Sequence, residues 1–102
     1  MKHMKKSEQD QFEVLRKINK KSDITQRELS STLGLSLGKI NYCLNSLKEK
    51  GFIKIKNFTK SKNKLKYMYV LTPQGISEKT KITINFMKQK MNEYEDLKKD
   101  LE

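Results

Sequence analysis

The 102-residue sequence contains no tryptophan and no alanine, and it has only one cysteine, one proline and one histidine. The single cysteine, Cys43, cannot form a disulfide within the chain and lacks the neighbouring cysteines of a zinc site. No apolar run approaches the ~18 residues of a membrane span, and the start lacks a signal peptide's apolar core. We therefore expect a cytoplasmic protein that is not embedded in a membrane.

Patterns typical of catalysis are also missing. His3 falls in a short basic leader, residues 1–6, which we expect to be disordered. No histidine or lysine is spaced to activate a serine or threonine, and there is no glycine-rich phosphate loop and no cluster of metal ligands. At this length the chain forms one domain, with an appended element at most. We expect no enzymatic activity, no cofactor and no metal.

Charge of one sign is in excess, with 23 Lys and Arg residues against 12 Asp and Glu and a net charge of +11. Such an excess predicts a polyanionic partner, which can be nucleic acid, an acidic protein or an anionic membrane surface. Residues 52–72 contain six lysines and no acid, whereas residues 73–102 contain six basic and six acidic residues. The concentration of charge in the middle segment indicates a functional surface, and the balanced tail is typical of an exposed helix.

Three helices are expected before the basic segment. Ser7 is a plausible N-cap for a first helix over residues 8–20, which carries apolar residues at helical spacing. Thr25 and Glu28 match a capping box for a second helix over residues 26–33, which Gly34 ends. Ser36 can cap a third helix, and this pair of helices with a short glycine turn is the helix-turn-helix pattern. The third helix ends at Gly51 and buries Ile40, Cys43, Leu44 and Leu47.

A basic hairpin follows the third helix. Residues 52–58 and 65–71 alternate as strands, and we expect Tyr67 and Tyr69 to pack within the hairpin. The segment between the strands is polar and strongly basic. Together these elements predict a winged helix-turn-helix over residues 7–72, mainly α with a small β-hairpin (α+β).

A long C-terminal helix follows, with Thr72 as its N-cap and Pro73 at its first position. Residues 73–102 would form a helix about 43 Å long, far longer than a 60-residue core can cover. Its apolar stripe therefore needs another partner, and the simplest one is the same helix of a second copy. The candidate dimerisation residues are Ile76, Thr80, Thr83, Ile84, Met87, Met91, Tyr94, Leu97 and Leu101.

Several stretches resemble the MarR-type winged-helix transcriptional regulators. Leu33–Ser36 is similar to the turn into their recognition helix, and residues 71–75 resemble the leucine-threonine-x-x-glycine signature after their wing. A closer resemblance is to the short MarR-type regulators associated with exopolysaccharide gene clusters, carried by residues 61–65, 71–76 and 86–95. The chain departs from typical MarR proteins by lacking the extra terminal helices and the wing's aspartate-x-arginine. These departures argue against regulation by a small phenolic ligand. The sequence does not identify an effector.

The resemblance implies a homodimer that binds double-stranded DNA, with half-sites about one helical turn apart. The third helix would enter the major groove, where asparagines can pair with adenine. The candidate contacts on this helix are Ser36, Leu37, Gly38, Lys39, Asn41, Tyr42, Asn45 and Ser46. At the wing tip, the candidates for phosphate or minor-groove contact are Lys60, Ser61, Lys62, Asn63 and Lys64. The alternative is a protein-interaction adaptor whose winged helix docks an acidic protein.

Overall fold

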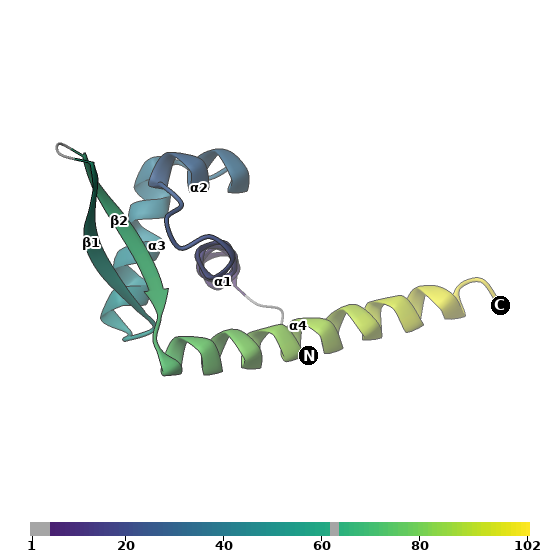
Figure 1. Cartoon of the computed structure of the whole chain (residues 1–102). Coiled ribbons are helices and arrows are strands. Elements are labelled where there is room, and N and C mark those ends of the chain that lie inside the picture. Colours follow the sequence, from purple (N-terminus) through teal and green to yellow (C-terminus); the bar gives the residue numbers. More distant parts are fainter. Residues whose placement is uncertain (1–4, 62–63) are drawn as a thin grey trace.

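Four helices and one hairpin make up the fold (Figure 1). The computed structural model describes residues 5–61 and 64–102, and for residues 57–61 and 64–66 it describes only the strand backbone. The elements are α1 (Lys6–Lys20), α2 (Gln26–Leu33), α3 (Leu37–Glu49), β1 (Ile53–Ser61), β2 (Lys64–Leu71) and α4 (Pro73–Lys99). The predicted class, a winged helix-turn-helix with a long C-terminal helix, is confirmed.

The first helix starts earlier than the sequence suggested. It begins at Lys6, its N-cap position is Lys5, and Ser7 lies inside the first turn instead of capping it. The ammonium of Lys6 lies 3.2 Å from the carboxylate of Asp10, one turn further along the helix. This (i, i+4) pair stabilises the added turn, so the prediction of Ser7 as the cap is wrong.

The helix-turn-helix forms from local caps, as predicted. The Thr25 hydroxyl accepts the backbone N–H of Glu28 at 3.0 Å, and the Ser36 hydroxyl accepts that of Lys39 at 3.1 Å. Gly34 ends α2 in the left-handed conformation, with a φ of 68°, which glycine adopts without steric cost. The hydroxyl of Ser30 donates to the carbonyl of Leu35 across this turn. These contacts fix the angle at which α3 leaves α2.

One hydrophobic core joins α1, α2, α3 and the base of the hairpin. Val14, Leu29 and Ile40 are completely inaccessible to solvent, which ties the first three helices together. All four residues expected on the inner face of α3 are buried. The cluster as a whole consists of Val14, Leu15, Ile18, Ile24, Leu29, Ile40, Cys43, Leu44, Leu47, Ile53 and Tyr69.

The hairpin extends further than predicted. Its strands pair antiparallel, with Ile53 opposite Leu71 and Ile55 opposite Tyr69, and they include residues 59–61, which were expected in the loop. The backbone N–H of Tyr69 donates to the carbonyl of Ser22 at 2.8 Å, which ties β2 to the segment after α1. Tyr69 is buried as expected, but Tyr67 is 52% exposed, so the expectation that both tyrosines pack is wrong for Tyr67.

Thr72 and Gly75 join the hairpin to α4. The Thr72 hydroxyl donates to the carbonyl of Gly51 and accepts the backbone N–H of Gly75 at 3.0 Å, while its own N–H donates to the carbonyl of Phe52. A β-carbon on Gly75 would overlap that Phe52 carbonyl and lie 2.9 Å from its carbon atom. Glycine at this position therefore permits α4 to start in contact with the backbone at the end of α3.

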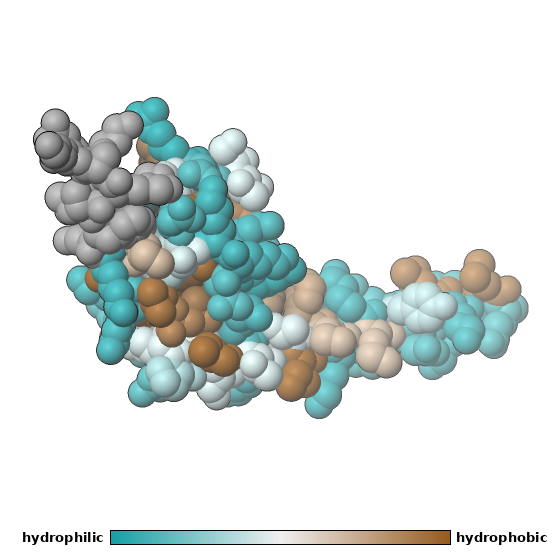
Figure 2. All heavy atoms as spheres, in the orientation of Figure 1, coloured by the Kyte–Doolittle hydropathy of each residue, from teal (hydrophilic) through white to brown (hydrophobic). Residues whose placement is uncertain are grey.

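Beyond this junction, α4 leaves the rest of the molecule. It crosses below α1, which is seen end-on in Figure 1, and then continues alone. The molecule measures 65 × 27 × 20 Å as a result. Hydrophobic residues show on the projecting part of the helix in Figure 2.

Replacing Gly75 with alanine should destabilise the protein, although alanine favours a helix over glycine by about 1 kcal/mol. The new methyl group displaces backbone rather than a flexible side chain, so we expect a net loss of about 1–3 kcal/mol in the free energy of unfolding. Urea denaturation measures this loss. Gly38→Ala is the matched control because a β-carbon there meets no atom within 4 Å, and it should leave stability unchanged or raise it.

Candidate nucleic-acid interface

One side of α3 is core and the other is open to solvent. Leu37 and Tyr42 are 47% and 61% exposed, unusual values for large apolar side chains in a well-packed domain. Asn41 and Asn45 are exposed one turn apart, and the side chain of neither forms a hydrogen bond within the described part of the chain. The exposed residues are Ser36, Leu37, Gly38, Lys39, Asn41, Tyr42 and Asn45. Seven of the eight predicted residues on this helix therefore share one open face.

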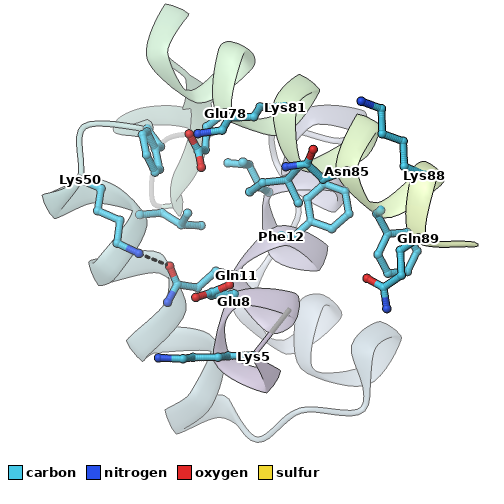
Figure 3. A pocket seen from close by; sticks show the side chains of 15 residues that line it. Lys5, Glu8, Gln11, Phe12, Lys50, Glu78, Lys81, Asn85, Lys88 and Gln89 are labelled. Carbon is cyan, nitrogen blue, oxygen red and sulfur yellow. Dashed lines mark hydrogen bonds between the residues drawn. The ribbon is translucent and has the colours of Figure 1, made fainter. Parts of the chain in front are cut away.

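Ser46 is the exception on this face. It is half-buried, and its hydroxyl donates to the side-chain carbonyl of Gln11 on α1 at 3.3 Å. The ammonium of Lys50 donates to the same oxygen at 2.9 Å, a contact drawn in Figure 3. Gln11 thus attaches the C-terminal half of α3 to α1, a role that the sequence analysis missed because no local pattern marks it.

Lys39 is held by a buried acid that the sequence analysis also missed. Asp10 is only 4% exposed, and one of its carboxylate oxygens lies 3.5 Å from the ammonium of Lys39. Its other carboxylate oxygen pairs with Lys6. A buried carboxylate requires such compensation, so Asp10 links α1 to the first turn of α3 and limits the freedom of Lys39.

Cys43 behaves as a small core residue. Its side chain is 1% exposed, and burial, with a smaller contribution from Asp10, raises the pKa of its thiol. A thiol with a raised pKa carries little thiolate at neutral pH, and the thiolate is the reactive species. The buried environment therefore favours packing over redox chemistry at this position.

The wing residues are only partly described. Lys60 and Ser61 lie in β1 and Lys64 in β2, whereas Lys62 and Asn63 fall outside the described residues. Closer to the base of the hairpin, Lys54 and Lys56 are exposed. The strand backbone thus places Lys60 and Lys64 at the end of the hairpin furthest from α4 (Figure 1).

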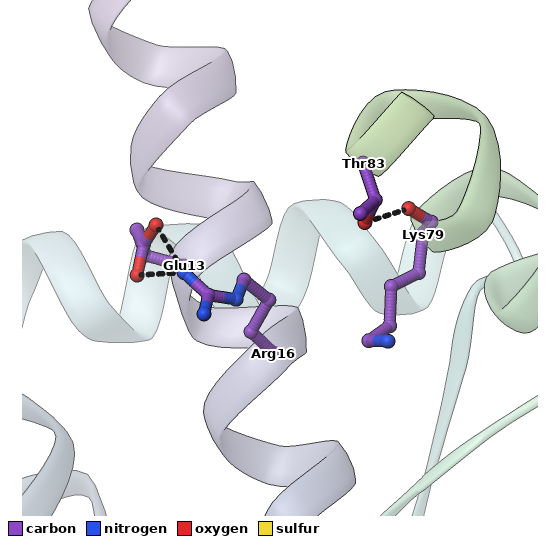
Figure 4. Close-up of polar contacts among 4 residues, drawn as sticks. All are labelled: Glu13, Arg16, Lys79 and Thr83. Atoms are coloured by element: carbon purple, nitrogen blue, oxygen red, sulfur yellow. Dashed lines mark hydrogen bonds and ion pairs between the residues drawn. The ribbon is translucent and has the colours of Figure 1, made fainter. Parts of the chain in front are cut away.

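The predicted dimerisation residues of α4 are free in a single copy of the chain. Exposed fractions rise along the helix from 47% at Ile84 to 64% at Met91 and 89% at Leu101. The hydroxyls of Thr80 and Thr83 donate to carbonyls of their own helix, at 3.0 and 2.6 Å (Thr83 in Figure 4). Because these hydroxyls are already satisfied, the two threonines add little polarity to the apolar stripe.

A groove of about 650 Å³ separates α1 from α4 (Figure 3). Phe12 and Phe86 meet beside it with ring centroids 6.3 Å apart. The guanidinium of Arg16 lies 5.8 Å from the Phe12 ring and is held by Glu13 at 3.1 Å (Figure 4). The ring contact therefore joins α1 to α4, and the cation–π contact within α1 holds the Phe12 ring in place.

Residues 5–61 and 64–102 contain neither a candidate metal site nor a candidate membrane span. No group of three or more His, Cys, Asp or Glu side chains is placed to hold a metal ion. None of the described helices is both long enough and apolar enough to cross a membrane.

The sequence and the fold match known proteins in different ways. Residues 11–54 match the family model of a winged helix-turn-helix DNA-binding domain. No curated protein sequence matches the chain.

Solved structures match over a longer part of the chain. MarR from E. coli in its apo form is 28% identical over 70% of this chain, with a TM-score of 0.59. Streptococcus pneumoniae FabT in complex with DNA is 23% identical over 84%, and a MarR/EmrR family transcriptional regulator from Acinetobacter sp. ADP1 is 20% identical over 81%, each with a TM-score of 0.63.

The chain covers 51–58% of the length of these three proteins. The matched part includes the helix-turn-helix and the first strand residues of the wing. The chain therefore contains a winged helix-turn-helix of the DNA-binding type and has the fold of the corresponding part of MarR family regulators.

Proposed function

We propose that this protein is a MarR-type transcriptional regulator, a cytoplasmic homodimer that binds specific sequences of double-stranded DNA and has no enzymatic activity. The observation that carries the proposal is the open face of α3, where exposed asparagines stand opposite a fully packed inner face. The basic hairpin beside this helix, with six lysines and no acid in residues 52–72, adds the charge that DNA requires. The neighbour bound to DNA shares this fold.

The recognition helix α3 would lie in the major groove with Asn41 and Asn45 towards the base edges. The side-chain amide of asparagine can donate its N–H to adenine N7 and accept from adenine N6, a bidentate pairing that makes it selective for adenine. Gly38 lets the helix backbone approach the DNA closely because it has no side chain. Sequence selection therefore falls mainly on the two asparagines.

The wing would supply affinity rather than selection. Lysine binds phosphate as a point charge, so Lys60, Lys62 and Lys64 would strengthen binding to any sequence. This division between a selecting helix and an attracting hairpin is consistent with the concentration of charge in the hairpin segment.

Two winged helices joined through α4 would read half-sites about one helical turn apart in a pseudo-palindrome. We further propose exopolysaccharide genes as the targets, supported by the resemblance of residues 61–65, 71–76 and 86–95 to the regulators of such clusters. Genomic footprinting tests both proposals, because it reports the half-site spacing and the neighbouring genes. Footprints that are absent from polysaccharide loci would contradict the assignment of targets alone.

Replacing Asn41 and Asn45 with alanine should remove sequence selection but preserve binding to random DNA. Each lost base contact costs about 1–3 kcal/mol of discrimination, so the two variants together should reduce specific affinity at least tenfold. Fluorescence anisotropy with the footprinted site and a scrambled site measures the difference. Asn19→Ala is the control, since Asn19 is exposed on α1, away from the face of α3. Unchanged discrimination would place base reading elsewhere.

Replacing Lys60, Lys62 and Lys64 with glutamine should weaken binding to all sequences and flatten its dependence on salt. If the dimer contacts 6–10 phosphates, the native protein loses about 10³–10⁵ in affinity between 50 and 200 mM salt. Each lost contact lowers the slope of log K against log salt by about 0.9. Lys54→Gln with Lys56→Gln is the matched control near the hairpin base. A native titration that is nearly flat in salt would contradict the electrostatic mechanism.

The protein should sediment at about twice its chain mass of 12.1 kDa at micromolar concentration. Met91→Glu should give a monomer, because it places a charge in the centre of the stripe without touching the winged helix. Deleting residues 87–102 should have the same effect. Circular dichroism checks that both variants stay folded, and a native protein that sediments as a monomer would overturn the dimer.

A further inference from the structure

The neutral C-terminal segment is divided into two halves of opposite charge. Residues 73–91 contain four lysines and one glutamate, whereas residues 92–102 contain five acids and two lysines. Asp96 lies in the last turn of α4 and Asp100 is its C-cap residue, where the helix dipole disfavours negative charge. Lys98 and Lys99 in the same turn match the dipole, so the acids beside them are not placed there by the dipole.

Three charged residues of α4, and a fourth beyond its C-cap, recur with a spacing of seven. They are Lys81, Lys88, Glu95 and Glu102, in the order basic, basic, acidic, acidic. Residues seven apart on a helix are separated by about 10.5 Å along its axis, too far to pair with each other. The ion pairs of α4 in the described chain join Lys90 to Glu93 and leave these four residues unpaired.

This charged row borders the exposed apolar stripe. Each of its members directly follows a stripe residue, so that Lys88 follows Met87 and Glu95 follows Tyr94. Successive residues are about 100° apart around a helix, which puts the row at the edge of any contact made through the stripe. Lys81 and Lys88 line the groove on its α4 side (Figure 3), and both are exposed.

We propose that α4 packs antiparallel against α4 of a second copy, centred between Met91 and Asn92. In that register Lys88 lies opposite Glu95 of the second copy and Lys81 lies opposite its Glu102, so two-fold symmetry gives four ion pairs. An isologous antiparallel contact brings the same edge of both helices together, as these pairs require. The inference rests on the homodimer of the proposed function and adds its direction and register.

The same register also matches the apolar residues. Met91 meets Met91 of the second copy near the two-fold axis, and Met87 falls beside Tyr94 of that copy. Methionine adapts its shape to such contacts, including contacts with aromatic rings. The exposed fractions of these side chains, 58% for Met87 and 64% for Met91 and Tyr94, mark the surface that the pairing would cover.

A parallel pair would bring like charges together. The segment 92–102, with a net charge of −3, would lie beside its own copy, and the basic half of α4 would do the same. Reversal of one helix converts both repulsions into attractions. The charge pattern therefore distinguishes two directions that the apolar stripe alone allows.

Spin labels on Ser77→Cys, in a Cys43→Ala background, measure the direction. Ser77 is exposed near the start of α4, away from the proposed contact. The antiparallel register separates the two labelled positions by about 43 Å along the helix axes. A parallel pair would separate them by about 10 Å, the distance between packed helices. Sedimentation first establishes that the labelled protein is dimeric.

Charge exchange tests the register. Lys81→Glu with Lys88→Glu, and separately Glu95→Lys with Glu102→Lys, should each raise the dimer dissociation constant at least about tenfold through four like-charge contacts. An equimolar mixture of the two variants should form heterodimers, because all four contacts are then attractive. One chain that carries all four changes should dimerise like the native protein. Lys20→Glu with Lys48→Glu is the control for net charge.

The outcomes separate the inference from the proposed function. A dimer with labels about 43 Å apart and restored pairing in the mixture supports the inference. A dimer with labels about 10 Å apart, or one that is insensitive to the charge changes, overturns the antiparallel register but leaves the homodimer standing. A native chain that stays monomeric, or pairs only with a different protein, overturns both.

Discussion

Thr72 and Gly75 contact the backbone of residues 51 and 52. This junction connects α3 and the hairpin to the projecting helix α4. Thr72 binds the carbonyls of Gly51 and Phe52 and caps α4, while Gly75 leaves room for the Phe52 carbonyl. The end of α3, the base of the hairpin and the start of α4 therefore meet at one point. These contacts therefore join α4 to the elements proposed to touch DNA.

Features that depend on a few neighbouring residues could be predicted from the sequence. The caps at Thr25, Ser36 and Thr72 each join a side chain to a backbone N–H three residues later, so their signals are local. The link from Lys50 to Gln11 joins residues 39 positions apart, and no sequence pattern marks such a pair. The same reason explains why the burial of Asp10 beside Lys39 was not expected.

Average charge concealed the organisation of α4. A net charge of zero over residues 73–102 is typical of an exposed helix and indicates no direction for its pairing. The ring contact with α1 lies at Phe86, near the middle of this helix, and the end of the helix projects with its apolar residues exposed. The order of the charges then becomes informative, because basic and acidic halves complement each other only when one helix is reversed.

Lys39 and the two asparagines differ in what DNA binding requires of them. For Lys39 to reach a phosphate, its ammonium must leave the buried carboxylate of Asp10, which would then lack part of its compensation. The side chains of Asn41 and Asn45 would lose no internal hydrogen bond on binding DNA, since neither side chain is hydrogen-bonded within the described residues. On the proposed function, Lys39 therefore serves mainly to hold α3 against α1. On the same proposal, selection among DNA sequences rests on Asn41 and Asn45, whose side chains form no hydrogen bond within the described residues.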